Sequence, residues 1–278
     1  MTEPVSKINS PDARPGRLKG SASVYLHSFY AIRAFQGRAG SKDKPRIYGA
    51  DEFNSRTNMM FNACKAGDPF AHYALVQVES ALEDEERNLT KDIRRVRKFL
   101  SKRSSRIKIA DAMSDDPVKF VINYANYGFQ LVDLLSRFDE LCQLLLNASH
   151  LNRIKAPKAR DWMEKASDQM RHLVSTAGGY RFTNVLREDL VLQTKGAKTG
   201  IEKLINTNFL DARQFTGFDD ICNYFATYDV ALNYGPPIKP IPVEQITNPK
   251  AASNGSAPES LADVRATAPG PLKKPVAG

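Results

Sequence analysis

The stretch SASVYLHSFYAIRAFQ, residues 21–36, decides how the N-terminal part of the chain folds. Apolar and polar side chains alternate over its first half. One face of residues 21–27 carries Ala22, Val24 and Leu26, and the other face carries Ser21, Ser23, Tyr25 and His27. A period of two residues predicts a half-buried β-strand.

This strand lacks an obvious neighbour in the sequence around it. A lone strand would leave its backbone N–H and C=O groups unpaired. We therefore expect it to pair antiparallel with the same strand of a second copy. The alternative is pairing with the RIKIA segment, residues 106–110, or with another segment of the same chain.

Two helices are expected after the strand, over residues 28–36 with Ser28 as the N-cap, and over residues 50–65. One strand followed by two helices suggests the ribbon-helix-helix arrangement, in which a two-stranded ribbon enters the major groove of DNA. Basic residues flank the predicted strand on both sides. The predicted DNA-binding residues are Ser23, Tyr25 and His27 at base edges, the bases Arg33, Arg38, Lys44 and Arg46 that follow the strand, and Gly49 at a phosphate. The backbone amide near Gly49 is included because helix N-termini attract anions.

The remaining sequence predicts a mainly α fold with long helices. Apolar periodicity indicates helices over residues 69–102, 128–151 and 156–176, an irregular or strand-like segment over 117–127, and further helical pieces to about 234. The predicted parts are a disordered basic arm (1–20), a ribbon-helix-helix-like DNA-binding region (21–67), a helical domain (68–234) and a disordered Pro-rich tail (235–278).

Positive charge is concentrated near the end of the long helix. Residues 87–108 contain ten Lys and Arg residues and one acid, Asp92. Bases near a helix C-terminus are favoured by its dipole, but ten exceed that need. A solvated face is one interpretation, and a surface for phosphates or for an acidic partner is the other.

Composition favours an anionic partner. The 278 residues carry 40 Lys and Arg against 31 Asp and Glu, a net charge of +9. The three cysteines are far apart, which argues against a disulfide framework. No signal peptide or membrane-length apolar run is recognisable, so we expect a cytoplasmic protein without a membrane partner.

Motifs for catalysis are missing from the sequence. It contains no phosphate-binding loop, no HExxH and no GxSxG, and its four histidines are scattered. We therefore expect no enzyme activity, no catalytic residues, no metal site and no cofactor.

Short motifs in a fixed order resemble the integrating-conjugative-element protein family that includes the AcaB-like transcriptional regulators. The motifs are Leu26-His27, AIRAFQGR (31–38), Ile47-x-Gly49 with Phe53, AGDPFA (66–71), Ser114 with Pro117, Tyr127-Gly128, Phe138-Asp139-x-Leu141, His150 and Arg187-x-Asp189. The chain departs from the family pattern at His72 and Tyr73, where aspartate and tryptophan are expected, and the Pro-rich tail lies outside the match.

The resemblance implies a DNA-binding regulator with a ribbon-helix-helix fold. On this basis we expect a homodimer that binds double-stranded DNA and regulates, as an activator, the transfer genes of an integrating conjugative element or plasmid. Other proteins of the transfer region are further candidate partners. The alternative function is a non-enzymatic scaffold of the conjugative transfer apparatus, using the basic face of the long helix.

Overall fold

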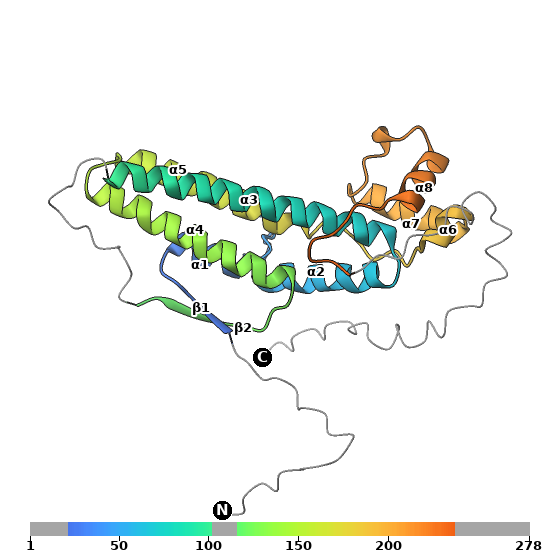
Figure 1. The fold of residues 1–278 in the computed structure, drawn as a ribbon, viewed down its shortest axis with the longest axis horizontal. Coiled ribbons are helices and arrows are strands. Elements are labelled where there is room, and N and C mark those ends of the chain that lie inside the picture. Colours follow the sequence, from blue (N-terminus) through green and yellow to red (C-terminus); the bar gives the residue numbers. More distant parts are fainter. Residues whose placement is uncertain (1–21, 102–115, 237–278) are drawn as a thin grey trace, which may run out of the picture.

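Helices dominate the part of the chain that the computed structural model describes, residues 22–101 and 116–236 (Figure 1). The elements are β1 (Ala22–Leu26), α1 (Phe29–Gln36), α2 (Ala50–Lys65), α3 (Pro69–Ser101), β2 (Val118–Ile122), α4 (Tyr127–His150), α5 (Ala156–Thr176), α6 (Arg187–Val191), α7 (Lys195–Asn206), a 3-10 helix (Ala212–Gln214) and α8 (Phe218–Thr227). The predicted mainly α fold, with a strand and two helices at its start, is confirmed. The predicted arm over 1–20, the RIKIA segment and all but the first two residues of the predicted tail lie outside the described residues.

The prediction that β1 finds no partner in its own chain is wrong. β1 pairs antiparallel with β2, with Ala22 opposite Ile122, Val24 opposite Phe120 and Leu26 opposite Val118. The two strands form a two-stranded sheet, here called the ribbon. The neighbouring sequence offered no partner because β2 follows only after α3. Of the two alternatives, pairing with another segment of the same chain is therefore the correct one.

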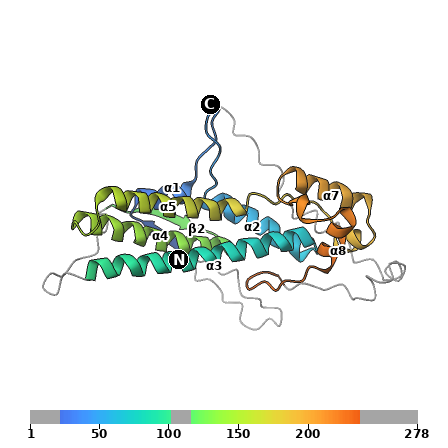
Figure 2. The same cartoon turned by 90° about the horizontal axis from the view of Figure 1, so that it is seen from above.

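Three long helices form the body of the molecule. α3 packs along α4, and α5 packs against both of them (Figures 1 and 2). The predicted apolar stripe of α3 is buried, and it includes Leu75, Val78, Leu82, Leu89, Ile93 and Val96. The short helices α6 to α8 lie near the start of α3, away from the ribbon (Figure 1).

The N-terminal elements share this core. α1 packs against α4 and α5, α2 packs against α3 and α4, and β1 contacts α4. The inner face of the ribbon contributes Leu26 and Ile122, and the ring of Phe120 stacks on Phe35 at a centroid distance of 4.1 Å. The predicted DNA-binding region, residues 21–67, thus shares its hydrophobic core with the predicted helical domain.

His72 and Tyr73, where the sequence departs from the expected motif, hold C-terminal segments against α3. His72 Nε2 lies 2.7 Å from the Val230 carbonyl oxygen, and His72 Nδ1 lies 3.1 Å from an Arg187 nitrogen. Since arginine can only donate, Nδ1 accepts and Nε2 carries the proton. Burial lowers the pKa of His72, which favours this neutral form. Tyr73 makes edge-on ring contacts, among them one with Phe225.

One acidic side chain interrupts the apolar stripe of α3. Glu85 is 4% exposed, and its Oε1 has no hydrogen-bond partner among the described residues. Burial raises the pKa of Glu85 to about 7, with a side-chain hydrogen bond from Asn88 opposing the shift and the charge of Asp92 adding to it. The group therefore takes up its proton at a higher pH in the folded chain than in the unfolded chain.

Glu85→Gln is expected to raise the free energy of unfolding at pH 8 by about 1–2 kcal/mol and to leave it nearly unchanged at pH 4. The stability that Glu85 contributes is complete below a pH of about 4.3 and is lost as the pH rises through the folded pKa. Partial solvent screening reduces the roughly 3 kcal/mol that the full shift implies. Urea unfolding at both pH values tests this. The exposed control Glu202→Gln should show no pH-dependent gain, and an equal gain in both variants would contradict the prediction.

Candidate nucleic-acid interface

The outer face of the ribbon is exposed and mixes polar, aromatic and apolar side chains. Tyr25 lies opposite Lys119, and Ser23 lies opposite Val121. Tyr25 is 50% exposed and Val121 is 69% exposed. The Lys119 ammonium lies 5.6 Å from the centroid of the Tyr25 ring, a cation–π geometry that orders both side chains. These four side chains, Ser23, Tyr25, Lys119 and Val121, are referred to below as the ribbon face.

Lys119 and Val121 were missed by the sequence analysis. Their segment VKFVI alternates only in part, because Val121 is apolar although it points outward. The pairing partner of β1 was unknown, so nothing placed these side chains beside Ser23 and Tyr25. The strand-like character of residues 117–127 was the one sequence feature that could have indicated them as the partner strand.

Asp139 fixes the ribbon to the helical body. Its carboxylate accepts hydrogen bonds from the backbone N–H of His27 at 2.9 Å and of Ser28 at 2.6 Å. Gln143 Nε2 donates to the same carboxylate at 2.7 Å. Ser28 is the N-cap of α1, as predicted, and its Oγ accepts from the Ala31 N–H. His27 is thus half-buried at the turn where β1 leads into α1.

Residues 37–49 form a hairpin-like projection, the basic finger, between α1 and α2. Arg38 N donates to the Ile47 carbonyl at 2.8 Å, Ile47 N donates back at 2.9 Å, and Ser41 N donates to Lys44 O at 2.9 Å. Figure 2 shows the finger in dark blue, projecting from the side of the body that faces away from α3. Its exposed bases include Lys42, Lys44 and Arg46.

Two glycines let the finger close at its base. Gly37 ends α1 with φ +68°, which favours glycine, and a Cβ there would lie 2.6 Å from the Gly49 nitrogen. Gly49 is buried against the end of α1, and a Cβ on it would lie 2.6 Å from the Gln36 carbonyl oxygen. The structure therefore gives Gly49 a packing role. The first turn of α2 that follows it carries the acids Asp51 and Glu52.

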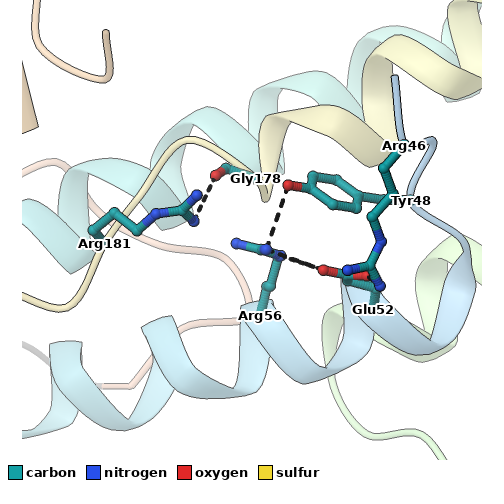
Figure 3. A network of polar contacts seen from close by, with 6 residues as sticks. All are labelled: Arg46, Tyr48, Glu52, Arg56, Gly178 and Arg181. Atoms are coloured by element: carbon teal, nitrogen blue, oxygen red, sulfur yellow. Dashed lines mark hydrogen bonds and ion pairs between the residues drawn. The ribbon is translucent and has the colours of Figure 1, made fainter. Parts of the chain in front are cut away.

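A network of polar contacts ties the finger to α2 (Figure 3). Arg46 and Arg56 share the carboxylate of Glu52, with Arg56 Nε 3.1 Å from Oε1. Both guanidinium groups lie over the Tyr48 ring, at 5.6 Å for Arg46 and 4.6 Å for Arg56. Two arginines against one glutamate leave a surplus positive charge at this end of the finger.

The end of α5 packs on the same network. A Cβ on Gly178 would lie 2.5 Å from the Tyr48 ring, so the small residue allows the ring to pack there. Arg181 donates to the Gly178 carbonyl at 3.1 Å and places a third guanidinium on this side of the network (Figure 3). The finger is therefore braced at its base against two helices.

The eight predicted DNA-binding residues fall into three places. Ser23 and Tyr25 lie on the ribbon face, with His27 at the end of β1. Arg33 is exposed on α1, with its guanidinium 5.2 Å from the Phe29 ring centroid. Arg38, Lys44, Arg46 and Gly49 belong to the finger, where Arg38 is half-buried and donates to the Pro45 carbonyl.

Comparison with known families identifies the chain at this point. The family described as transcriptional regulator AcaB matches residues 14–214, which include both strands of the ribbon, the finger and α3. The chain belongs to the AcaB family. The family match confirms the resemblance that the short motifs indicated. The family consists of transcriptional regulators, so this AcaB family member is a transcriptional regulator.

One solved structure is similar to this chain. The crystal structure of selenomethionine-containing AcaB from uropathogenic E. coli is similar over 74% of this chain and 96% of that chain, with 11% identity and a TM-score of 0.45. Comparison with curated proteins found no match.

The described residues of this AcaB family member show neither a metal-binding cluster nor a membrane-spanning helix. Within residues 22–101 and 116–236, no three His, Cys, Asp or Glu side chains are grouped so that they could hold a metal ion. No helix in the same ranges is both long and apolar enough to cross a bilayer.

Proposed function

We propose that this AcaB family member regulates transcription by binding double-stranded DNA, with the ribbon in the major groove. The observation that carries the proposal is the exposed ribbon face. The major groove is about 12 Å wide and admits a two-stranded β-ribbon. Tyr25, Lys119 and Ser23 offer hydrogen-bonding groups for base edges, and Val121 offers an apolar contact for a thymine methyl group.

The basic finger supports the same proposal. Lys42, Lys44 and Arg46 are exposed on a projection that is held at its base, so they are suited to phosphate contacts. Arg33 would add a further phosphate contact from α1. In this arrangement the finger and α1 position the duplex, and the ribbon face specifies its sequence.

We also propose a homodimer, although β1 pairs with β2 of its own chain and not with β1 of a second copy. Within the described residues β1 pairs with β2 on one edge only, and its other edge has no strand beside it. A second copy could add there and place two ribbon faces on one DNA site. We further propose that the protein acts in the cytoplasm as an activator of conjugative transfer genes. Other proteins of the transfer region would be further partners.

Removing the ribbon face is expected to weaken binding to a selected DNA site at least tenfold. The variant combines Ser23→Ala, Tyr25→Ala and Lys119→Ala, and each lost base contact costs about 1–3 kcal/mol. The site is first selected from a random duplex library by the full chain, and affinity is then measured by fluorescence anisotropy.

A matched control changes the same residue types elsewhere. It combines Ser136→Ala, Tyr234→Ala and Lys198→Ala, which are exposed positions outside the ribbon and the finger. The control should bind like the wild type. A folded ribbon-face variant with unchanged affinity and sequence preference would refute the proposal. A stable complex with transfer proteins and no DNA affinity would favour the scaffold function instead.

A further inference from the structure

A straight row of positive side chains runs along the second half of α3. Arg87, Lys91, Arg94 and Lys98 follow one another at intervals of four, three and four residues, so they share one face of the helix. All four are exposed. At 1.5 Å per residue the row is about 16 Å long. It is called the α3 stripe below.

Most of the stripe is not neutralised within the described residues. Arg87 pairs with Asp84, whereas Lys91, Arg94 and Lys98 form no ion pair with residues of 22–101 or 116–236. The stripe borders an open hollow of about 650 Å³, also lined by Glu86, Thr90 and Arg95.

The remaining charges near the hollow increase its positive character. The carboxylate of Glu86 is paired with Arg137 of α4, at 2.9 Å, which removes the one acid of the lining. Arg95 lies over the Trp162 ring at 5.0 Å and adds a further positive charge. Asp92, the one acid of the basic segment, accepts the hydrogen bond from the indole of Trp162 at 2.9 Å.

The stripe lies apart from the ribbon and the finger. α4 packs against both α3 and β1 and lies between them (Figure 1). The finger projects from the side of the body that faces away from α3 (Figure 2). The ribbon and the helix that carries the stripe therefore lie on opposite sides of α4.

We propose that the α3 stripe is a second, sequence-independent site for the phosphate backbone of duplex DNA. It would hold a segment other than the one read by the ribbon face, or the same molecule bent around the body. Evenly spaced cations, about 5–6 Å apart between neighbouring side chains, suit a polymer with regularly repeated phosphates. An acidic protein partner fits less well, because the hollow is lined by no aromatic or large apolar anchor, which the core of a protein interface needs. The inference rests on the proposed function only in its choice of DNA as the polyanion.

The test measures how the affinity for a duplex of scrambled sequence depends on salt. The full-length variant combines Lys91→Gln, Arg94→Gln and Lys98→Gln, which keeps good helix formers at exposed positions. Each phosphate contact adds about 0.9 to the slope of log affinity against log salt. The slope is therefore expected to fall by about 2–3 in the variant. The control Lys65→Gln, Lys195→Gln and Lys198→Gln removes the same charge from exposed sites on α2 and α7, and its slope should stay near that of the wild type.

The outcomes separate this inference from the proposed function. The fall in slope should persist when the ribbon face is also replaced by alanine, because the two surfaces act independently. If the wild type shows no sequence preference but the stripe variant still loses slope, the stripe site stands and the ribbon proposal fails. An equal fall in stripe variant and control would show an effect of net charge alone and overturn the inference. An unchanged slope, with or without loss of a protein partner, would also overturn it.

Discussion

Asp139→Ala is expected to lower the free energy of unfolding by about 4 kcal/mol, since each buried polar group left without a partner costs about 1–3 kcal/mol. Asp139 is 2% exposed, and its carboxylate accepts from the backbone N–H groups of His27 and Ser28 and from Gln143. Alanine would leave both N–H groups without an acceptor at the junction of β1 and α1. The loss is large against a typical total stability of about 5–15 kcal/mol.

The matched control for Asp139 is Gln143→Ala. It removes one hydrogen bond to the same carboxylate and should cost only about 1 kcal/mol. Urea denaturation followed by circular dichroism measures both variants. Because Asp139 holds the turn that follows β1, DNA binding should weaken in Asp139→Ala even where the chain is folded. A variant with the stability of Gln143→Ala would show that the turn does not depend on the carboxylate.

The contacts of Asp139 show which structural features could be predicted from the sequence and which could not. The motif Phe138-Asp139-x-Leu141 was recognisable, and Ser28 was correctly predicted as a helix cap. Local chemistry determined the cap, because a cap is satisfied within three residues, whereas the motif was recognised by its resemblance to a family pattern. That the Asp139 carboxylate binds a turn more than a hundred residues earlier could not be read from either segment alone.

The helices were predictable for the same reason. For the five helices between residues 28 and 176, the 3.6-residue periodicity and the breaks at Gly67 to Pro69 and at Gly178 place the helix ends within a residue or two of the structure. The later helical pieces were given no bounds, and the last of them ends at Thr227 rather than near residue 234. The partner of β1 was not predictable, because strand pairing is non-local and the alternation of residues 118–122 is incomplete. The face predicted for base edges therefore contained Ser23, Tyr25 and His27 but lacked Lys119 and Val121, and the structure places His27 half-buried at the turn after β1.

The basic residues were recognised from sequence, but their roles were not. From the sequence, Arg46 and Arg38 looked equivalent to Lys44 as DNA-binding residues. The structure shows that Arg38 is half-buried and bonded within the finger, and that Arg46 shares Glu52 with Arg56. Charge density along a sequence indicates an anionic partner, whereas the neutralisation of each charge depends on the folded neighbours.

Asp68→Ala is expected to cost about 4–5 kcal/mol of unfolding free energy. Asp68 precedes α3 and is 2% exposed. Its Oδ1 accepts from the N–H groups of Phe70 and Ala71, at 2.8 and 3.0 Å, and caps the helix. Its Oδ2 accepts from the hydroxyl groups of Tyr180 at 2.7 Å and Thr183 at 3.1 Å. The change removes a cap worth about 1–2 kcal/mol and also leaves the buried Tyr180 hydroxyl without its acceptor.

Two further variants separate these contributions. Asp68→Asn keeps an oxygen acceptor for the two backbone N–H groups, so it should lose less stability than Asp68→Ala. Tyr180→Phe removes one hydroxyl and leaves the cap intact, and about 1–2 kcal/mol is expected for it. The order of midpoints in urea should then be wild type, Tyr180→Phe and Asp68→Asn, with Asp68→Ala lowest. Equal midpoints for the two Asp68 variants would show that the cap contributes nothing. In that case the AGDPFA segment would stabilise the fold only through the hydrogen bond from the Tyr180 hydroxyl to Asp68.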